Sequence, residues 1–225
     1  MAASISTPSP GEAAADTAAR MDAMYRHQRH IYDLTRKFYL FGRDRLIDLL
    51  PARPGSTVLE MGCGTGRNLV KLARRKTGAK LYGVDVSREM LVQSEHNLAR
   101  AGLAGEVALA QAGGQGFDPA SVGVERFDVI YFSYVLSMIP DWRPVVERAL
   151  TQLAPGGTLA IVDFGDQLSA PAWRRRLLLG WLSLFDVHPR AEIERGLREI
   201  AASRGGPTHD EDIFSGYAYL LTIRG

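Results

Sequence analysis

A glycine-rich run at residues 58–66 carries the clearest chemical signal in the sequence, which there reads Val-Leu-Glu-Met-Gly-Cys-Gly-Thr-Gly. Glycines between a strand and a helix let the backbone turn tightly and approach a ligand closely. The third glycine, Gly66, follows the second by two positions, and Arg67 stands where a dinucleotide fingerprint has its last glycine. The loop therefore suits a pyrophosphate poorly and is expected to hold a different ligand.

Two acidic residues near this loop indicate which ligand it holds. Glu60 comes two positions before the first glycine, at the strand end, where it can accept hydrogen bonds from a cationic ligand. Asp85 ends the next expected strand, about 25 positions on, and can bind both hydroxyls of a ribose. A ligand with a cationic amino-acid end and a ribose, but no phosphate, is S-adenosylmethionine, which is the predicted cofactor.

Alternating strand-like and helix-like segments are expected to position these residues. Strands are predicted at 57–61, 80–85, 106–110, 127–132 and 158–163. Helices are predicted at 67–75, after Ser87 as N-cap, and at 143–153. Such alternation predicts a parallel sheet with helices on both faces. The Tyr- and Ile-rich tail at 213–224 predicts a closing antiparallel strand at the edge of that sheet.

Composition and charge exclude several classes of protein. The 225 residues include 27 Lys and Arg against 25 Asp and Glu, a balance that does not indicate a nucleic-acid partner. The single cysteine excludes an internal disulfide and a cysteine-based zinc site, and the five histidines show no metal-ligand spacing. No apolar run approaches the roughly 20 residues of a membrane span. We expect a cytoplasmic protein, either free or peripheral on the inner face of the membrane.

From about Gly55 to Asp163 the chain resembles the class I S-adenosylmethionine-dependent methyltransferases. The resemblance rests on four runs in the same order, at 60–66, 83–90, 127–130 and 153–157. The cofactor-binding residues that it implies are Glu60, Gly62, Cys63, Gly64, Asp85, Val86, Gln111, Ala112 and Ser133. Gln111 stands where the family often has an Asp, and its carbonyl can accept the same hydrogen bond from the adenine amino group. Cys63 is expected to be only a small packing side chain in the loop.

The resemblance also implies the architecture of the whole chain. It is an α/β, Rossmann-like, doubly wound and mostly parallel seven-stranded sheet with one antiparallel edge strand and an added N-terminal helix. Residues 1–19 are predicted to be a disordered tail. Residues 20–225 are expected to be a single methyltransferase domain, with a lid or membrane-facing helix at 20–50, a cofactor-binding core at 55–163, and substrate-side helices and closing strands at 164–225.

The predicted helix at 20–50 has a patterned surface. Apolar residues share one face, arginines recur every seventh position on the other, and tyrosines recur every seventh position at the border. These arginines are Arg29, Arg36 and Arg43, and the tyrosines are Tyr25, Tyr32 and Tyr39. Two interpretations remain open: a helix docked on the domain with solvated charges, or a lid that also meets an anionic membrane.

The run at 30–45 resembles the leading segment of the bacterial betaine-lipid N-methyltransferases, with further similarity at 134–142, 162–167 and 217–218. This resemblance implies trimethylation of the amino group of diacylglyceryl-homoserine, which gives diacylglyceryl-N,N,N-trimethylhomoserine. Its partner would be a lipid with an amino headgroup at an anionic membrane surface, with no nucleic acid and no metal. The alternatives are a phosphatidylethanolamine N-methyltransferase, a methyltransferase for a small soluble amine, and a non-catalytic cofactor-binding protein.

An amine must lose its proton before it attacks the sulfonium methyl group. The candidate catalytic groups for that proton are Tyr25, His30 and Tyr32. An arginine can hold a substrate carboxylate or a lipid phosphate at two points, and an aromatic ring can stabilise a methylated ammonium. The candidate substrate-binding residues are accordingly Arg29, Arg36, Arg43 and Tyr134. Asp163, Asp166 and His188 follow the last parallel strand and are further candidates for substrate contact.

Overall fold

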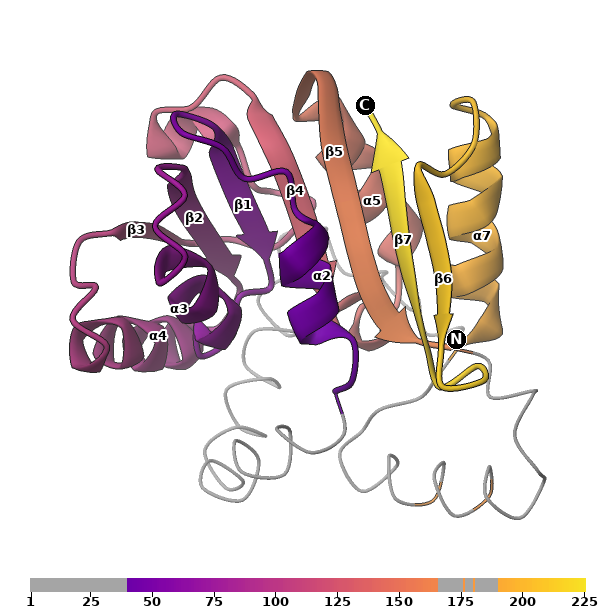
Figure 1. Cartoon of the computed structure of the whole chain (residues 1–225), viewed down its shortest axis with the longest axis horizontal. Coiled ribbons are helices and arrows are strands. Elements are labelled where there is room, and N and C mark those ends of the chain that lie inside the picture. Colours follow the sequence, from indigo (N-terminus) through magenta and orange to yellow (C-terminus); the bar gives the residue numbers. More distant parts are fainter. Residues whose placement is uncertain (1–39, 166–175, 177–179, 181–189) are drawn as a thin grey trace, which may run out of the picture.

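The computed structural model describes residues 40–165, 176, 180 and 190–225. Its strands are β1 (Thr57–Met61), β2 (Lys80–Asp85), β3 (Val107–Gln111), β4 (Phe127–Ser133), β5 (Leu153–Phe164), β6 (His209–Ile213) and β7 (Ala218–Arg224). They form one seven-stranded sheet in the order β3-β2-β1-β4-β5-β7-β6. Strands β1 to β5 pair in parallel, whereas β7 runs antiparallel to both β5 and β6 (Figure 1). The predicted α/β, Rossmann-like, mostly parallel fold is confirmed.

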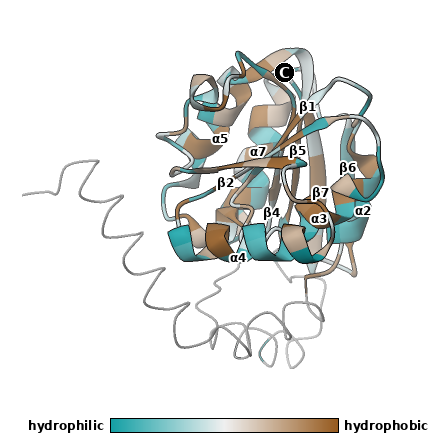
Figure 2. Cartoon of the chain, turned by 90° about the vertical axis from the view of Figure 1, so that its left-hand side faces the viewer, coloured by the Kyte–Doolittle hydropathy of each residue, from teal (hydrophilic) through white to brown (hydrophobic). Residues whose placement is uncertain are grey.

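Helices cover both faces of the sheet. The helices are α2 (Arg43–Leu49), α3 (Arg67–Ala73), α4 (Arg88–Arg100), α5 (Trp142–Thr151) and α7 (Ala191–Ala202), with short 3-10 turns η1 (Pro119–Val122) and η2 (Leu136–Met138). Helices α2, α3 and α4 contact one another in sequence, and α5 contacts α7. Helix α4 shows both hydrophilic and hydrophobic residues, as a helix with one buried side requires (Figure 2).

Successive residues of β4 alternate between the two faces. Ile130 and Phe132 pack with the buried residues of α5 and α7, whereas Val129 and Tyr131 pack with those of α2. Both faces of this central strand are therefore apolar, which is the pattern of a parallel strand buried between two helix layers. The carboxyl ends of β1, β2 and β4 meet at one edge of the sheet, where the glycine-rich loop follows β1.

The start of the described chain corrects one prediction. A single helix was predicted over residues 20–50, but Gly42 has a left-handed φ of 80° and α2 begins only after it, with seven residues. A Cβ on Gly42 would lie 2.4 Å from Ile213 Cδ1, so a glycine is needed where α2 meets β6. The predicted tail at 1–19 and the rest of the predicted helix, up to residue 39, lie outside the described residues.

The closing strands differ in arrangement from the predicted single strand at 213–224. Strand β7 lies one place in from the edge, because β6 pairs along its outer side from His209 to Ile213. Elsewhere the predicted elements are confirmed within one or two residues for most boundaries, and Ser87 Oγ caps α4 by accepting from Met90 N at 3.3 Å. Among the described helices, none combines the length and apolar character needed to cross a bilayer.

Candidate functional site

The glycine-rich loop joins β1 to α3 and adopts conformations that favour glycine. Gly62, Gly64 and Gly66 have φ values of 70°, 52° and 74°. A Cβ on Gly62 would lie 2.6 Å from Val135 Cγ2, and one on Gly66 would lie 2.2 Å from Ser94 Oγ. The loop is therefore packed closely on both sides, and side chains at these two positions would displace their neighbours.

Asp85 ties the loop to the end of β2. Its Oδ2 accepts a hydrogen bond from Gly64 N at 2.7 Å, and its Oδ1 accepts one from Ser87 N at 2.9 Å. The residue is only 8% exposed. These two backbone bonds fix the orientation of the carboxylate at the end of β2. Gly64 and Asp85, both predicted to bind the cofactor, are thus hydrogen-bonded to each other, and their contact with the cofactor stays a prediction.

Glu60 lies beneath the loop and is held by two neutral side chains. Its Oε1 accepts from Asn68 Nδ2 at 2.7 Å, and its Oε2 accepts from the Tyr131 hydroxyl at 3.0 Å. Burial raises the pKa of Glu60 to about 8, against the lowering effect of Asn68, Tyr131 and the charge of Arg43. Both oxygens already have protein partners, so the predicted contact with a cationic ligand stays a prediction.

The predicted adenine-side residues lie together at the end of β3. Gln111 pairs with Asp85 in the sheet, and its Nε2 donates to Val86 O at 3.1 Å. This bond uses the amide nitrogen, which orients the amide so that its carbonyl oxygen remains an acceptor. The backbone N–H of Ala112 donates to Asp85 O at 3.0 Å. Recognition of adenine by Gln111 stays a prediction that this orientation supports.

A buried hydroxyl at the end of β4 bears on whether the site fits the predicted cofactor. The Oγ atom of Ser133 is buried and has no hydrogen-bond partner among the described residues. An unpaired buried hydroxyl costs about 1–3 kcal/mol, and a polar ligand group beside it would remove that cost. Together with the tight glycine turn, this hydroxyl fits a polar ligand at the carboxyl ends of β1, β2 and β4.

Cys63 behaves as the sequence predicted. Its side chain is buried, and its Sγ lies 3.0 Å from the position of a Cβ on Gly83. Burial raises the pKa of the thiol well above its usual value, with the charges of Asp85 and Glu60 acting in the same direction. The thiol is therefore neutral and serves to pack the loop against β2.

Two predicted substrate-binding residues are buried. Arg43 was placed on a polar helix face, and that placement is wrong: the residue is 9% exposed and its Nε donates to Leu40 O at 3.3 Å. Tyr134 is 4% exposed, and its hydroxyl donates to Phe41 O at 2.5 Å. Their roles toward substrate stay predictions. The remaining predicted catalytic and substrate-binding residues, all outside the described residues, are Tyr25, Arg29, His30, Tyr32 and Arg36.

Of the predicted substrate-contact residues after the last parallel strand, only Asp163 is among the described residues. Asp163 is 1% exposed, and its carboxylate accepts from Ser137 N at 3.1 Å and from Phe164 N at 2.8 Å. It therefore holds the chain after β4 in place, a role that sequence reasoning missed. Asp166 and His188 lie outside the described residues. Asn68, which no sequence signal pointed to, is part of the site through its bond to Glu60.

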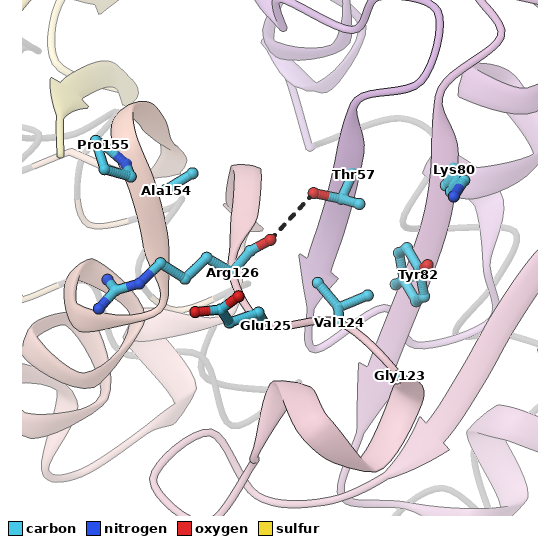
Figure 3. Close-up of a pocket in the computed structure, with 9 residues that line it drawn as sticks. All are labelled: Thr57, Lys80, Tyr82, Gly123, Val124, Glu125, Arg126, Ala154 and Pro155. Carbon is cyan, nitrogen blue, oxygen red and sulfur yellow. Dashed lines mark hydrogen bonds between the residues drawn. The ribbon is translucent and has the colours of Figure 1, made fainter.

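Two hollows on the described surface lie away from the loop. One, of about 580 Å³, is lined by residues that include Thr57, Lys80 and Arg126, at the amino ends of β1, β2 and β4. Figure 3 shows this hollow and the hydrogen bond from Thr57 Oγ1 to Arg126 O, at 3.3 Å. The other, of about 440 Å³, lies between α5 and α7. Neither is lined by the glycine-rich loop.

In the parts of the chain described, no group of three or more His, Cys, Asp or Glu side chains forms a possible metal site.

Residues 25–205 match the methyltransferase-domain family, so the chain belongs to that family. This membership confirms the coarser of the two resemblances seen in the sequence, the one to class I S-adenosylmethionine-dependent methyltransferases. The family confirms S-adenosylmethionine as the methyl donor.

Curated relatives share part of their length with this chain. The nocamycin O-methyltransferase of Saccharothrix syringae is 34% identical over 133 residues, which cover 58% of this chain and 46% of that protein. The trans-aconitate 2-methyltransferase of Methylobacterium radiotolerans is 33% identical over 130 residues, which cover 57% of this chain and 45% of that protein. The chain thus spans about half the length of the curated relatives it matches.

Solved structures show the same fold. An S-adenosylmethionine-dependent methyltransferase from Aquifex aeolicus superposes with a TM-score of 0.60 at 18% identity, covering 84% of this chain and 92% of that one. Geranyl diphosphate methyltransferase, solved with its substrate and sinefungin, superposes with a TM-score of 0.62 at 18% identity, covering 81% and 77%. These likenesses confirm the fold class.

Proposed function

We propose that this chain catalyses methyl transfer from S-adenosylmethionine to a nucleophilic acceptor. The observation that carries the proposal is the arrangement of Asp85, which joins Gly64 N and Ser87 N through one carboxylate. It stands at the same sheet edge as the Ser133 hydroxyl, which has no partner within the described parts of the chain. Bound at this edge, the cofactor supplies an electrophilic methyl group, and Asp85, Ser133 and the backbone of Gly62 and Gly64 would hold it.

The residues described act on this reaction by orienting rather than by proton transfer. Displacement at a sulfonium carbon needs no protonation of the leaving group, so alignment of the two reactants is the main contribution, up to roughly 7–11 kcal/mol. Asp85 fixes the loop against the end of β2, and Glu60 fixes it from beneath through Asn68. Proton removal from an acceptor is assigned to the predicted residues Tyr25, His30 and Tyr32.

For the acceptor, we propose the amino group of a lipid, diacylglyceryl-homoserine, which would be methylated three times. The support is the resemblance of residues 30–45, 134–142 and 162–167 to the betaine-lipid N-methyltransferases. A second candidate, a small molecule outside the membrane, is favoured by the curated relatives, which are named for nocamycin and trans-aconitate. N-methylation and O-methylation are thus the two chemistries to be separated.

The test uses the full chain with methyl-labelled S-adenosylmethionine and vesicles containing either diacylglyceryl-homoserine or phosphatidylethanolamine, each in an anionic lipid background. Label in a chloroform-extractable product with the mass of the trimethylated homoserine lipid supports the proposal. Label in phosphatidylethanolamine alone transfers the assignment to that headgroup. Label only in the aqueous phase, with a cell extract of small metabolites added, favours the second candidate. Cofactor binding without any transfer contradicts the proposed activity.

A further inference from the structure

The segment between β4 and α5 is fixed at its start by a buried acid. This segment contains η2, whose first N–H groups lack intrahelical partners, as in any helix. The Ser137 N–H donates to Asp163 Oδ2 at 3.1 Å, and Asp163 Oδ1 accepts from Phe164 N at 2.8 Å. Asp163 belongs to β5, the strand next to β4, so the bond ties the segment to the sheet.

The other end of the same segment is held by an arginine from a different element. Arg190 immediately precedes α7, and its guanidinium donates to three carbonyl oxygens. Nη1 bonds to Pro140 O at 3.1 Å, and Nη2 bonds to Leu136 O at 3.1 Å and to Ile139 O at 2.5 Å. A planar, always charged guanidinium suits such a cluster of acceptors better than a lysine ammonium does. Leu136 is the first residue of η2, and Ile139 and Pro140 follow its last residue, so the guanidinium spans the length of η2.

The segment held in this way forms one wall of the glycine-rich loop. Val135, directly before η2, lies so close to Gly62 that a Cβ there would be 2.6 Å from Val135 Cγ2 and 2.8 Å from Val135 Cγ1. Ser133, whose hydroxyl the described residues leave without a partner, lies two residues earlier on β4. Any movement of η2 would shift Val135 relative to Gly62, because packed side chains have little free space between them.

We infer that Arg190 and Asp163 are positioning residues for the cofactor site, which they act on by clamping η2 from both ends and so holding Val135 against Gly62. This inference rests on the proposed function, because its consequence is that displacement of Val135 would weaken cofactor binding. Arg190 lies directly before α7, outside the predicted cofactor-binding core, and holds η2 from there. The clamp is thus a mechanical connection between the C-terminal part of the domain and the glycine-rich loop.

The test measures binding of S-adenosylhomocysteine by calorimetry, together with KM for S-adenosylmethionine and kcat. We expect Arg190→Gln to weaken binding and to raise KM by about tenfold or more, with a smaller change in kcat at saturating cofactor, because misplacement of a supporting wall is costly. Arg190→Lys should recover only part of the loss. The matched control is Arg198→Gln on the same helix, which removes ion pairs to Glu194 and Asp210 and should leave binding unchanged.

A double-mutant cycle then asks whether Arg190 acts through Val135. Val135→Ala alone should weaken binding, and adding Arg190→Gln to it should cost much less than Arg190→Gln costs in the native background. Additive losses, or unchanged binding in folded Arg190→Gln, would overturn the inference; if that variant does not fold, Arg190→Lys and Val135→Ala carry the cycle. Native protein that binds S-adenosylhomocysteine but transfers no methyl group contradicts only the proposed function. Native protein that binds none contradicts both.

Discussion

Acidic side chains are exposed at the amino ends of the parallel strands and buried at their carboxyl ends. At the amino end, the exposed Asp128 accepts from Thr57 N at 2.8 Å and from Thr57 Oγ1 at 3.0 Å, beside the larger of the two hollows. At the carboxyl end, Glu60 and Asp85 are buried, and the Ser133 hydroxyl has no partner among the residues that the structure describes. Hollow volume alone would select the amino end, opposite to the proposed cofactor site. Two buried carboxylates beside a turn of left-handed glycines distinguish the carboxyl end, because the burial of ionisable groups costs stability.

The largest contrast is expected between two aspartates, one at each end. Asp85→Asn should weaken S-adenosylhomocysteine binding by about 100-fold, because the neutral amide loses charged hydrogen bonds to the loop and to a ribose, each worth about 1.5–3 kcal/mol. Asp128→Asn removes a carboxylate that accepts from Thr57 N and Thr57 Oγ1, and it should leave binding unchanged. Calorimetric titration of both variants measures the difference, and equal losses would erase the distinction between the two ends.

A second contrast compares two glycines with nearly equal backbone angles. Gly62 has a φ of 70° and Gly123, at the amino-end hollow, has a φ of 72°, so alanine brings about 1 kcal/mol of backbone strain at either position. Only at Gly62 would the new Cβ collide, with Val135; nothing lies within 4 Å at Gly123. Gly62→Ala should therefore lower cofactor affinity about tenfold or more, since overpacking costs about 1–3 kcal/mol. Gly123→Ala should lower only the melting temperature, and reduced affinity in this variant would count against the assignment.

The third contrast concerns pH. The pKa of Glu60 is about 8 in the folded protein, above its usual value of 4.5, so the folded state retains a proton that the unfolded chain releases. Its contribution to the free energy of unfolding is therefore complete below pH 4.5 and is lost as pH rises through about 8. Glu60→Gln resembles the protonated acid. Its free energy of unfolding should therefore rise relative to that of the native chain as the pH rises from 5 to 8.5. Urea unfolding of the native chain and of Glu60→Gln, at pH 5 and at pH 8.5, measures this change, and the exposed Glu125→Gln is the control. If the free energy of unfolding changes equally with pH in the native chain and in Glu60→Gln, the assigned pKa is refuted.

The smallest effect is expected at two serines. Ser133→Ala removes a buried hydroxyl that has no partner among the described residues, so stability should hold or rise slightly while cofactor affinity falls about three- to tenfold, the value of one hydrogen bond. Ser121 lies near the amino end and donates to Asp118 O at 2.6 Å. Ser121→Ala should show the reverse pattern, with stability lower by about 0.5–1 kcal/mol and affinity unchanged. Thermal unfolding and calorimetry on the same samples decide between the patterns.

The cofactor end was predictable because its geometry is mostly local. Gly62 and Gly64 belong to one short loop, and Asp85 ends the neighbouring parallel strand, so β/α alternation alone brings these residues to one edge. The 2.7 Å bond between Gly64 N and Asp85 Oδ2 follows from that topology. The cap at Ser87 is likewise a signal contained within four residues.

Features that depend on packing between distant segments were not predictable in this way. Gly42 adopts a left-handed φ beside Ile213 and α2 begins only after it, so the seven-residue spacing of one continuous helix does not place Arg43. The bonds of Arg190 to three carbonyls exist only because α7 begins beside η2. Strand β6 was not predicted because its charged residues show no alternation with apolar residues. A strand at the edge of a sheet does not need such alternation.

That charged outer strand has a consequence for how molecules of this protein meet one another. Strand β6 reads His-Asp-Glu-Asp-Ile, with Asp210 paired to Arg198 and Glu211 paired to Arg45. The outermost strand of a sheet offers backbone hydrogen bonds that a second molecule can use to extend the sheet, and charged side chains oppose such pairing. Two copies aligned along β6 would bring carboxylates against carboxylates. The acidic strand thus discourages edge-to-edge aggregation, on the side of the sheet farthest from the glycine-rich loop and β3.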